Sequence, residues 1–80
     1  MGFRSTTAQQ TAVRPITDFT GKSGADIRVA TEEIIRARTG DSMIKVGRAS
    51  NRHSQIVRYQ KELGRLRAVR PSLVQTVDGY

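Results

Sequence analysis

The sequence predicts a mainly α protein of two helices joined by a short extended segment, with an extended N-terminal arm and a C-terminal tail. Three observations indicate this fold class. A capping signal opens a helical pattern at Ser23, a glycine ends it at Gly40, and a second helical pattern ends at Pro71. The chain of 80 residues forms at most one small domain. We divide it into an arm (1–22), a helical domain (23–70) and a tail (71–80).

The arm is rich in Ser, Thr and Gln and contains few large apolar side chains. Such a stretch buries too little surface to fold alone. It is therefore either a disordered leader or an extended arm that becomes ordered on a neighbouring molecule. The residues that would contact the neighbour are Phe3, Val13, Ile16 and Phe19. Organellar transit peptides have a similar composition, but Pro15 interrupts the amphipathic helix that such a peptide requires.

The first helix is expected at residues 24–38. Ser23 and Asp26 have the spacing of a capping box, and the acid would lie where the helix dipole favours a negative charge. Glycine is the favoured residue just past a helix C-terminus, so Gly40 marks the end. The apolar face of this helix consists of Ile27, Ala30, Ile34 and Ala37.

Residues 43–46 form the short extended segment between the helices. Their β-branched side chains between two glycines suit either one strand or an irregular connector. No large apolar residue follows at 48–55, so we expect no second strand. If residues 43–46 form a strand, another chain would have to cover or pair its free edge.

The second helix ends before Pro71, and either Asn51 or Ser54 can cap its start. One face of the helix is apolar and the opposite face is cationic. The apolar stripe consists of Ile56, Tyr59, Leu63 and Leu66, and the opposite face carries Arg58, Lys61 and Arg65. Gly64, on the flank between them, either permits close approach of a partner backbone or is simply tolerated.

The tail, residues 71–80, shows no alternation strong enough to predict a strand. A terminus of this kind is expected to fray. It could instead dock on a neighbouring molecule through its apolar residues. These are Leu73, Val74, Val77 and Tyr80.

The net charge of +7 is concentrated in residues 42–76, which hold eight basic residues and one acid, Glu62. Arginine outnumbers lysine eleven to three in the chain, and its planar fork suits phosphate or carboxylate. We therefore predict an acidic partner, either protein subunits of a larger assembly or nucleic acid. The predicted partner-binding or phosphate-binding residues are Arg48, Arg52, Arg58, Lys61, Arg65, Arg67 and Arg70.

Several function classes are disfavoured by the residues that the chain lacks. It has no cysteine and a single histidine, His53, so we expect no disulfide, metal site, cofactor or enzyme activity. Gly21-Lys22-Ser23 is similar to the end of a phosphate-binding loop, but Ile16 stands where its first glycine should be. No apolar run is long enough to span a membrane. Because the core of so short a chain is thin, we expect association into an oligomer or particle.

Two resemblances to known families indicate which kind of partner the chain binds. The Thr39-Gly40 stop and the Tyr-x-x-Glu-Leu spacing that starts at Tyr59 resemble the small head-tail joining proteins of tailed bacteriophages, the lambda W type. That resemblance implies a non-enzymatic ring protein between portal and tail, with a β-hairpin between two helices. The run from Ser54 to Val69 is similar to the second helix of the two-helix ribosomal protein beside the exit tunnel of the large subunit. It implies a long, unbroken first helix and binding to ribosomal RNA.

Together these observations predict a non-catalytic structural component of a large nucleoprotein particle. A virion protein, either a phage connector or a capsid-associated protein, is favoured because the Thr-Gly stop and the short extended segment fit it. The expected location is then the virion or the host cytoplasm. The alternatives are a ribosomal protein that binds ribosomal RNA in the ribosome, and a small dimeric DNA-binding protein.

Overall fold

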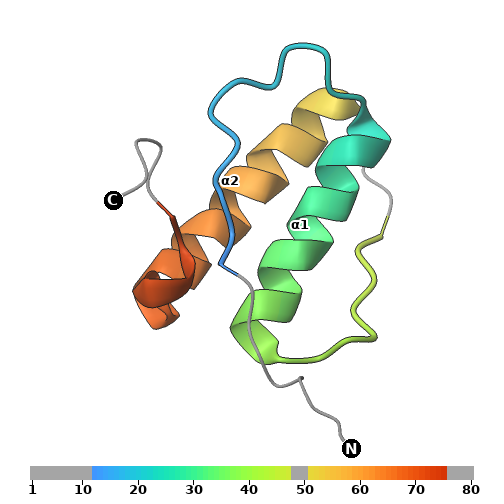
Figure 1. The fold of residues 1–80 in the computed structure, drawn as a ribbon. Helices are drawn as coiled ribbons and strands as arrows, with labels where there is room; N and C mark the ends of the chain where they lie inside the picture. Colours follow the sequence, from blue (N-terminus) through green and yellow to red (C-terminus); the bar gives the residue numbers. More distant parts are fainter. Residues whose placement is uncertain (1–11, 48–50, 76–80) are drawn as a thin grey trace, which may run out of the picture.

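Two helices lie side by side and run in the same direction (Figure 1). The computed structural model describes residues 12–47 and 51–75, and it contains α1 (Gly24–Thr39), α2 (Arg52–Val69) and the short 3-10 helix η1 (Pro71–Leu73). No strand occurs within these two ranges. The predicted mainly α class, with two helices and a short connecting segment, is confirmed.

The parallel arrangement places both helix N-termini at one end of the molecule. A Cβ atom added to Gly24 at the start of α1 would lie 3.8 Å from the Cα of Arg52 at the start of α2. Near the other end, Arg38 of α1 forms an ion pair with Glu62 of α2. The connector therefore has to return along the length of α1 before α2 begins (Figure 1).

The first helix begins and ends at the residues that its sequence indicates. The Ser23 hydroxyl accepts a hydrogen bond from the Asp26 N–H, and the Asp26 carboxylate accepts one from the Ser23 N–H, so the predicted capping box is present. Gly40 has φ 79°, a left-handed conformation that glycine adopts without steric cost. Its N–H donates to the Arg36 carbonyl. The helix is one residue longer than predicted.

Asn51, rather than Ser54, caps α2. Its side-chain oxygen accepts a hydrogen bond of 2.8 Å from the Ser54 N–H, which satisfies one of the free donors in the first turn. At the other end the Arg70 N–H donates to the Leu66 carbonyl, and Pro71 begins the 3-10 turn. The predicted stop before Pro71 is confirmed.

The connector is irregular and does not form the strand that residues 43–46 allowed. Its one buried residue among those described, Val46, donates its N–H to the Glu32 carboxylate of α1 at 3.2 Å. A side chain thus satisfies a backbone group that a second strand would otherwise pair. No strand, and therefore no free strand edge, occurs in the described part of the connector. The β-hairpin implied by the phage resemblance is likewise not formed there.

The long first helix implied by the ribosomal resemblance is also not observed. The left-handed conformation of Gly40 ends α1 after 16 residues.

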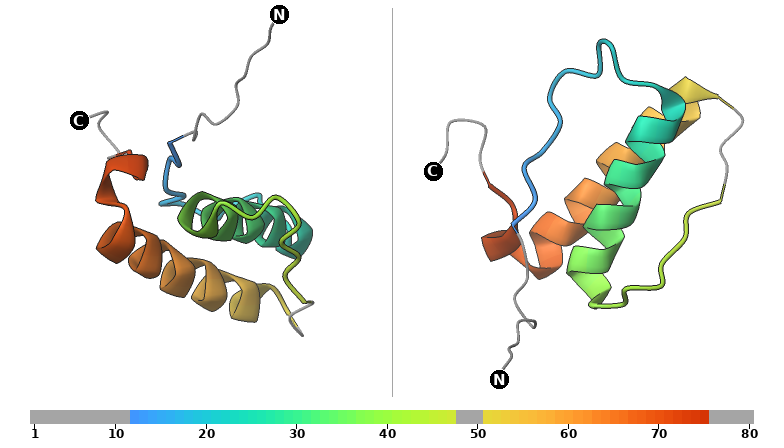
Figure 2. Two further views of the ribbon diagram at one scale, coloured as in Figure 1. Left: turned by 90° about the horizontal axis from the view of Figure 1, so that it is seen from below. Right: turned by 45° about the vertical axis from the view of Figure 1, so that its right-hand side comes forward.

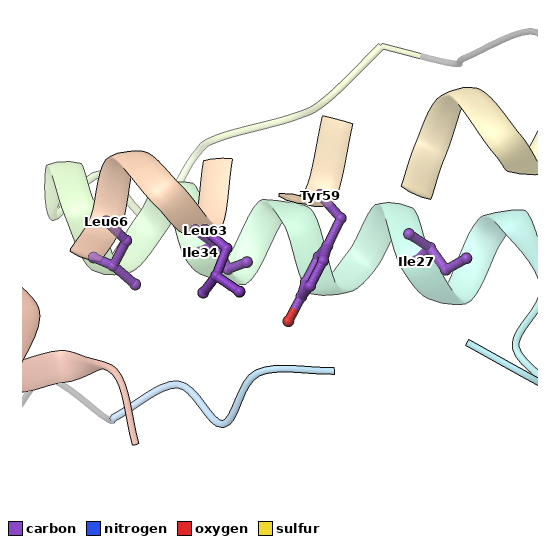
Figure 3. Packing of buried hydrophobic residues seen from close by; sticks show 5 residues of the cluster. All are labelled: Ile27, Ile34, Tyr59, Leu63 and Leu66. Carbon is purple, nitrogen blue, oxygen red and sulfur yellow. The ribbon is translucent and has the colours of Figure 1, made fainter. Parts of the chain in front are cut away.

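The core lies on the side of the helix pair that the arm covers (Figure 3). Five buried side chains form it: Ile27, Ile34, Tyr59, Leu63 and Leu66. Three of the four residues in the predicted stripe of α2 are among them, and Ile56 packs against them partly buried. On α1 the buried set also includes Thr31, whose hydroxyl donates to the Ile27 carbonyl and is thereby satisfied. Ala30 and Ala37 are partly buried.

The arm packs on its own helices. Val13, Ile16 and Phe19 contact the core, and the Phe19 ring meets the Tyr59 ring edge to face at a centroid distance of 5.6 Å. The Tyr59 hydroxyl accepts a hydrogen bond of 2.9 Å from the Ile16 N–H. The expectation of a disordered leader, or of an arm that needs a neighbour, is therefore wrong for residues 12–22. Phe3 lies outside the described residues.

The tail pairs with the N-terminal arm beside the end of α2 (Figure 2). Val13 and Val74 form a parallel bridge, in which the Val13 N–H donates to the Leu73 carbonyl and the Gln75 N–H donates to the Val13 carbonyl. Leu73 and Val74 also pack against the core. These two tail residues thus dock within the chain, whereas Val77 and Tyr80 lie outside the described residues.

Candidate nucleic-acid interface

The seven cations predicted to bind a partner fall into groups with different environments. Arg48 lies outside the described residues, and the other six lie on α2 or at its C-cap. Of the six, Arg52 and Arg65 donate side-chain hydrogen bonds to other described residues. Arg70 is half-buried at the C-cap. Arg58, Lys61 and Arg67 are exposed.

Arg52 holds the turn between the arm and α1. Its Nε donates to the Lys22 carbonyl at 2.7 Å, and a terminal nitrogen donates to the Phe19 carbonyl. One guanidinium therefore ties the start of α2 to the end of the arm. The main contribution of Arg52 is to the fold, because both hydrogen bonds are made to backbone carbonyls of the same chain.

Arg65 is held by the one acid of the basic segment. Its Nη1 donates to Oε2 of Glu62 at 3.0 Å, and Nη2 of Arg38 on α1 lies 3.4 Å from the other carboxylate oxygen. The Glu62 side chain is only 6% exposed, whereas that of Arg65 is 49% exposed. The carboxylate is thus buried between the two helices, and the Arg65 guanidinium reaches the surface.

Arg58 and Lys61 occupy the solvent side of α2, away from the arm. Neither side chain makes a hydrogen bond or an ion pair with any other described residue. They are less than one helical turn apart, so they present two charges on one short stretch of rigid backbone. Together with Arg67, which is also exposed, these two residues form the least compensated part of the predicted site among the described residues.

Four acids outside α2 accept hydrogen bonds from backbone N–H groups. Asp18 accepts a hydrogen bond from the Thr20 N–H, and Asp26 from the Ser23 N–H. These bonds favour the ionised form and hold the pKa of each carboxyl below its ordinary value. Asp41 accepts from the Met43 N–H, and Glu32 from the Val46 N–H. The one acid of α2, Glu62, is buried, so the surface of this helix lacks the carboxylates that usually intersperse a charged helix face.

Arg67 is exposed on α2, and its positive charge acts on the Tyr59 hydroxyl. Burial raises the pKa of the Tyr59 phenol above its ordinary value of 10.0, while the hydrogen bond from Ile16 and the positive charge of Arg67 act in the opposite direction. The phenol stays protonated at neutral pH, so it adds no negative charge to this surface.

The Gly21-Lys22-Ser23 turn is a helix cap and not an open phosphate loop. Gly21 has φ 82°, and the hydroxyl and N–H of Ser23 are both engaged by Asp26. The Lys22 N–H donates to the Phe19 carbonyl, so the backbone donors of Lys22 and Ser23 are already used.

Among the described residues there is no candidate metal site and no candidate membrane span. No group of three or more His, Asp or Glu side chains there is arranged to hold a metal ion. Neither helix in this part of the chain is long and apolar enough to cross a membrane.

One member of the candidate site was not predicted. Arg38 comes from α1, and only the fold brings it to Glu62. The one indication in the sequence was Glu62 itself, the lone acid among eight cations on an otherwise cationic segment.

Comparison of the chain with protein-family models, curated proteins and solved structures finds no match.

Proposed function

We propose that the chain is a non-catalytic structural component of a large nucleoprotein particle, and that it binds the phosphate backbone of nucleic acid through α2. The observation that carries this proposal is the pair Arg58 and Lys61. Both are exposed on a rigid helix and lack a carboxylate partner among the described residues. Cations in this state bind phosphates and release the counterions of the nucleic acid.

Nucleic acid fits this surface better than a protein partner does. The large apolar side chains that are exposed in the described chain are Val29, Met43, Val57 and Val69. They are four residues on three different elements, whereas a protein interface typically has a continuous apolar centre. Direct reading of base sequence is not part of the proposal, because Tyr59 is buried and cannot stack on bases.

Among particles, a virion is the one that we favour, with the chain as a capsid-associated protein. The stop at Gly40 supports this choice over the ribosomal alternative, because that resemblance requires a first helix that continues past this point. The connector role is the less favoured virion role, because the hairpin that it implies is not formed in the described residues. A free DNA-binding protein would need a dimer to supply enough contact surface.

The experiment compares two variants with equal net charge. Arg58→Gln with Lys61→Gln lowers the charge from +7 to +5, and so does Arg14→Gln with Lys45→Gln, where both residues are exposed and lie outside α2. Binding to short duplex RNA and duplex DNA is measured by fluorescence anisotropy at one fixed salt concentration. We expect the α2 variant to bind much more weakly than the control variant.

Equal loss in the two variants would show that only total charge matters and would contradict the proposed site. Size-exclusion chromatography with light scattering measures the oligomeric state and so tests the alternative in which the chain docks on other protein subunits. A closed ring with no affinity for either duplex would favour a connector over the function proposed here.

A further inference from the structure

Arg38, Glu62 and Arg65 form a cluster that joins the two helices near their C-terminal ends. The two arginines contact opposite oxygens of one carboxylate, at 3.4 Å and 3.0 Å. We infer that Arg38 and Arg65 together bind one phosphate group of a nucleic-acid backbone, and that Glu62 is the positioning residue that holds both guanidiniums. This inference rests on the function proposed above and extends its site from α2 onto α1.

Most N–H groups of the two arginines are not used by Glu62. Arg65 donates a single hydrogen bond to it, through Nη1. The contact of Arg38 is an ion pair without hydrogen-bond geometry, and Oε1 of Glu62 has no hydrogen-bond partner in the described chain. A guanidinium carries five N–H donors in a planar fork that matches phosphate oxygens. Both forks therefore keep donors for a second anion.

The cluster continues the row of exposed cations on α2. Arg65 follows Lys61 by one helical turn, and Arg58 lies about 10 Å along the helix axis from Arg65. Because α1 and α2 run parallel, Arg38 in the last turn of α1 meets this row from the neighbouring helix. A phosphate held between Arg38 and Arg65 would thus lie on the same path as phosphates held by Arg58 and Lys61.

A role for Glu62 in stability alone does not account for the cluster well. Burying a carboxylate carries a large desolvation cost, and well-packed apolar residues often replace buried ion pairs without loss of stability. Here the buried carboxylate restrains two long side chains whose outer parts remain accessible, since Arg38 is 23% and Arg65 49% exposed. Restrained guanidiniums lose less conformational entropy when they bind an anion.

The decisive variant is Glu62→Gln. An effect of total charge and a positioning role of Glu62 predict changes of opposite sign in the affinity for nucleic acid. Removing one negative charge raises the net charge from +7 to +8, so simple electrostatics predicts tighter binding to nucleic acid. If Glu62 positions the two arginines, binding to short duplex RNA and duplex DNA weakens instead, by about tenfold for the loss of one oriented charge-assisted contact. Tighter binding by the folded variant would overturn the inference.

A second pair of variants decides the question if Glu62→Gln does not fold, which circular dichroism reports. Arg38→Gln and Arg36→Gln each remove one charge from the last turn of α1, but among the described residues only Arg38 contacts Glu62. We expect Arg38→Gln to weaken duplex binding by about tenfold and to lower its salt dependence by about one phosphate contact. Arg36→Gln should change neither quantity.

Equal behaviour of these two variants would also overturn the inference. That result is distinguishable from failure of the proposed function, which would appear as weak binding by the unmodified chain. A chain that binds duplexes, loses binding on removal of Arg58 and Lys61, and gains it with Glu62→Gln would retain the function and refute the cluster.

Discussion

The apolar side and the cationic side of α2 are completed in different ways. On the apolar side Tyr59, Leu63 and Leu66 are covered by α1, by the arm and by the tail of the same chain. On the cationic side Arg58 and Lys61 have no partner among the described residues. The comparison shows that the chain fills its apolar core itself, so charge is a stronger reason to expect a partner than lack of core.

The same division runs through the cations themselves. Arg52 and Arg65 face backbone carbonyls and a carboxylate, respectively, whereas Arg58 and Lys61 face solvent. All four contribute equally to the net charge that the sequence displays. Only the fold shows that Arg52 is used within the structure, that Arg65 is used in part, and that Arg58 and Lys61 remain fully available to a partner.

The largest expected effect is on the apolar side. Tyr59→Ala removes a side chain that is 1% exposed and contacts Phe19 of the arm. We expect a loss of about 3–5 kcal/mol in the free energy of unfolding, because a cavity opens under the arm. Denaturant unfolding followed by circular dichroism measures it. Val57→Ala, at a half-exposed position on the same helix, should cost less than about 1 kcal/mol and serves as the control.

The hydroxyl of Tyr59 gives a smaller effect that depends on pH. Burial raises the pKa of Tyr59, so the folded chain retains this proton at a pH where the unfolded chain, with a pKa near 10.0, releases it. The contribution is fully present below pH 10 and declines as the pH rises through the pKa of the folded state. We expect denaturant unfolding in this range to show the decline in the parent chain.

Tyr59→Phe should remove that alkaline decline. At neutral pH it should also cost about 1 kcal/mol, because the Ile16 N–H loses its acceptor. An alkaline decline that is as steep in Tyr59→Phe as in the parent chain would show that another group causes it.

The smallest expected effect compares two glycines. Gly64 lies mid-helix, and a Cβ added there meets nothing within 4 Å, so Gly64→Ala should raise the free energy of unfolding by about 0.5–1 kcal/mol. Gly40 also has open space but has φ 79°, so Gly40→Ala should lower it by about 1 kcal/mol. Thermal unfolding measures both. A destabilising Gly64→Ala would mean that the exposed side of α2 is packed by something in the free protein.

The sequence predicts local features well because they depend on neighbouring residues. The capping box at Ser23, the stop at Gly40 and the stop before Pro71 require only a few adjacent side chains and their backbone preferences. The apolar stripe of α2 follows from helical periodicity alone.

The remaining features depend on contacts between residues far apart in the chain. The parallel direction of the helices follows from how the connector returns, which no local pattern encodes. The packing of the arm is not predictable from a local pattern because the arm packs on its own chain. It depends on Tyr59 accepting a hydrogen bond from the Ile16 N–H, 43 residues away. Arg38 could not be predicted as a neighbour of Glu62 for the same reason.

The salt dependence of duplex binding tests the central claim most directly. The slope of log affinity against log salt counts the phosphates that the protein neutralises. For the variant that lacks the charges of Arg58 and Lys61, we predict a slope smaller by about 2 than in the variant that lacks those of Arg14 and Lys45. Identical slopes in the two variants would contradict the claim that the exposed cations of α2 bind the nucleic-acid backbone.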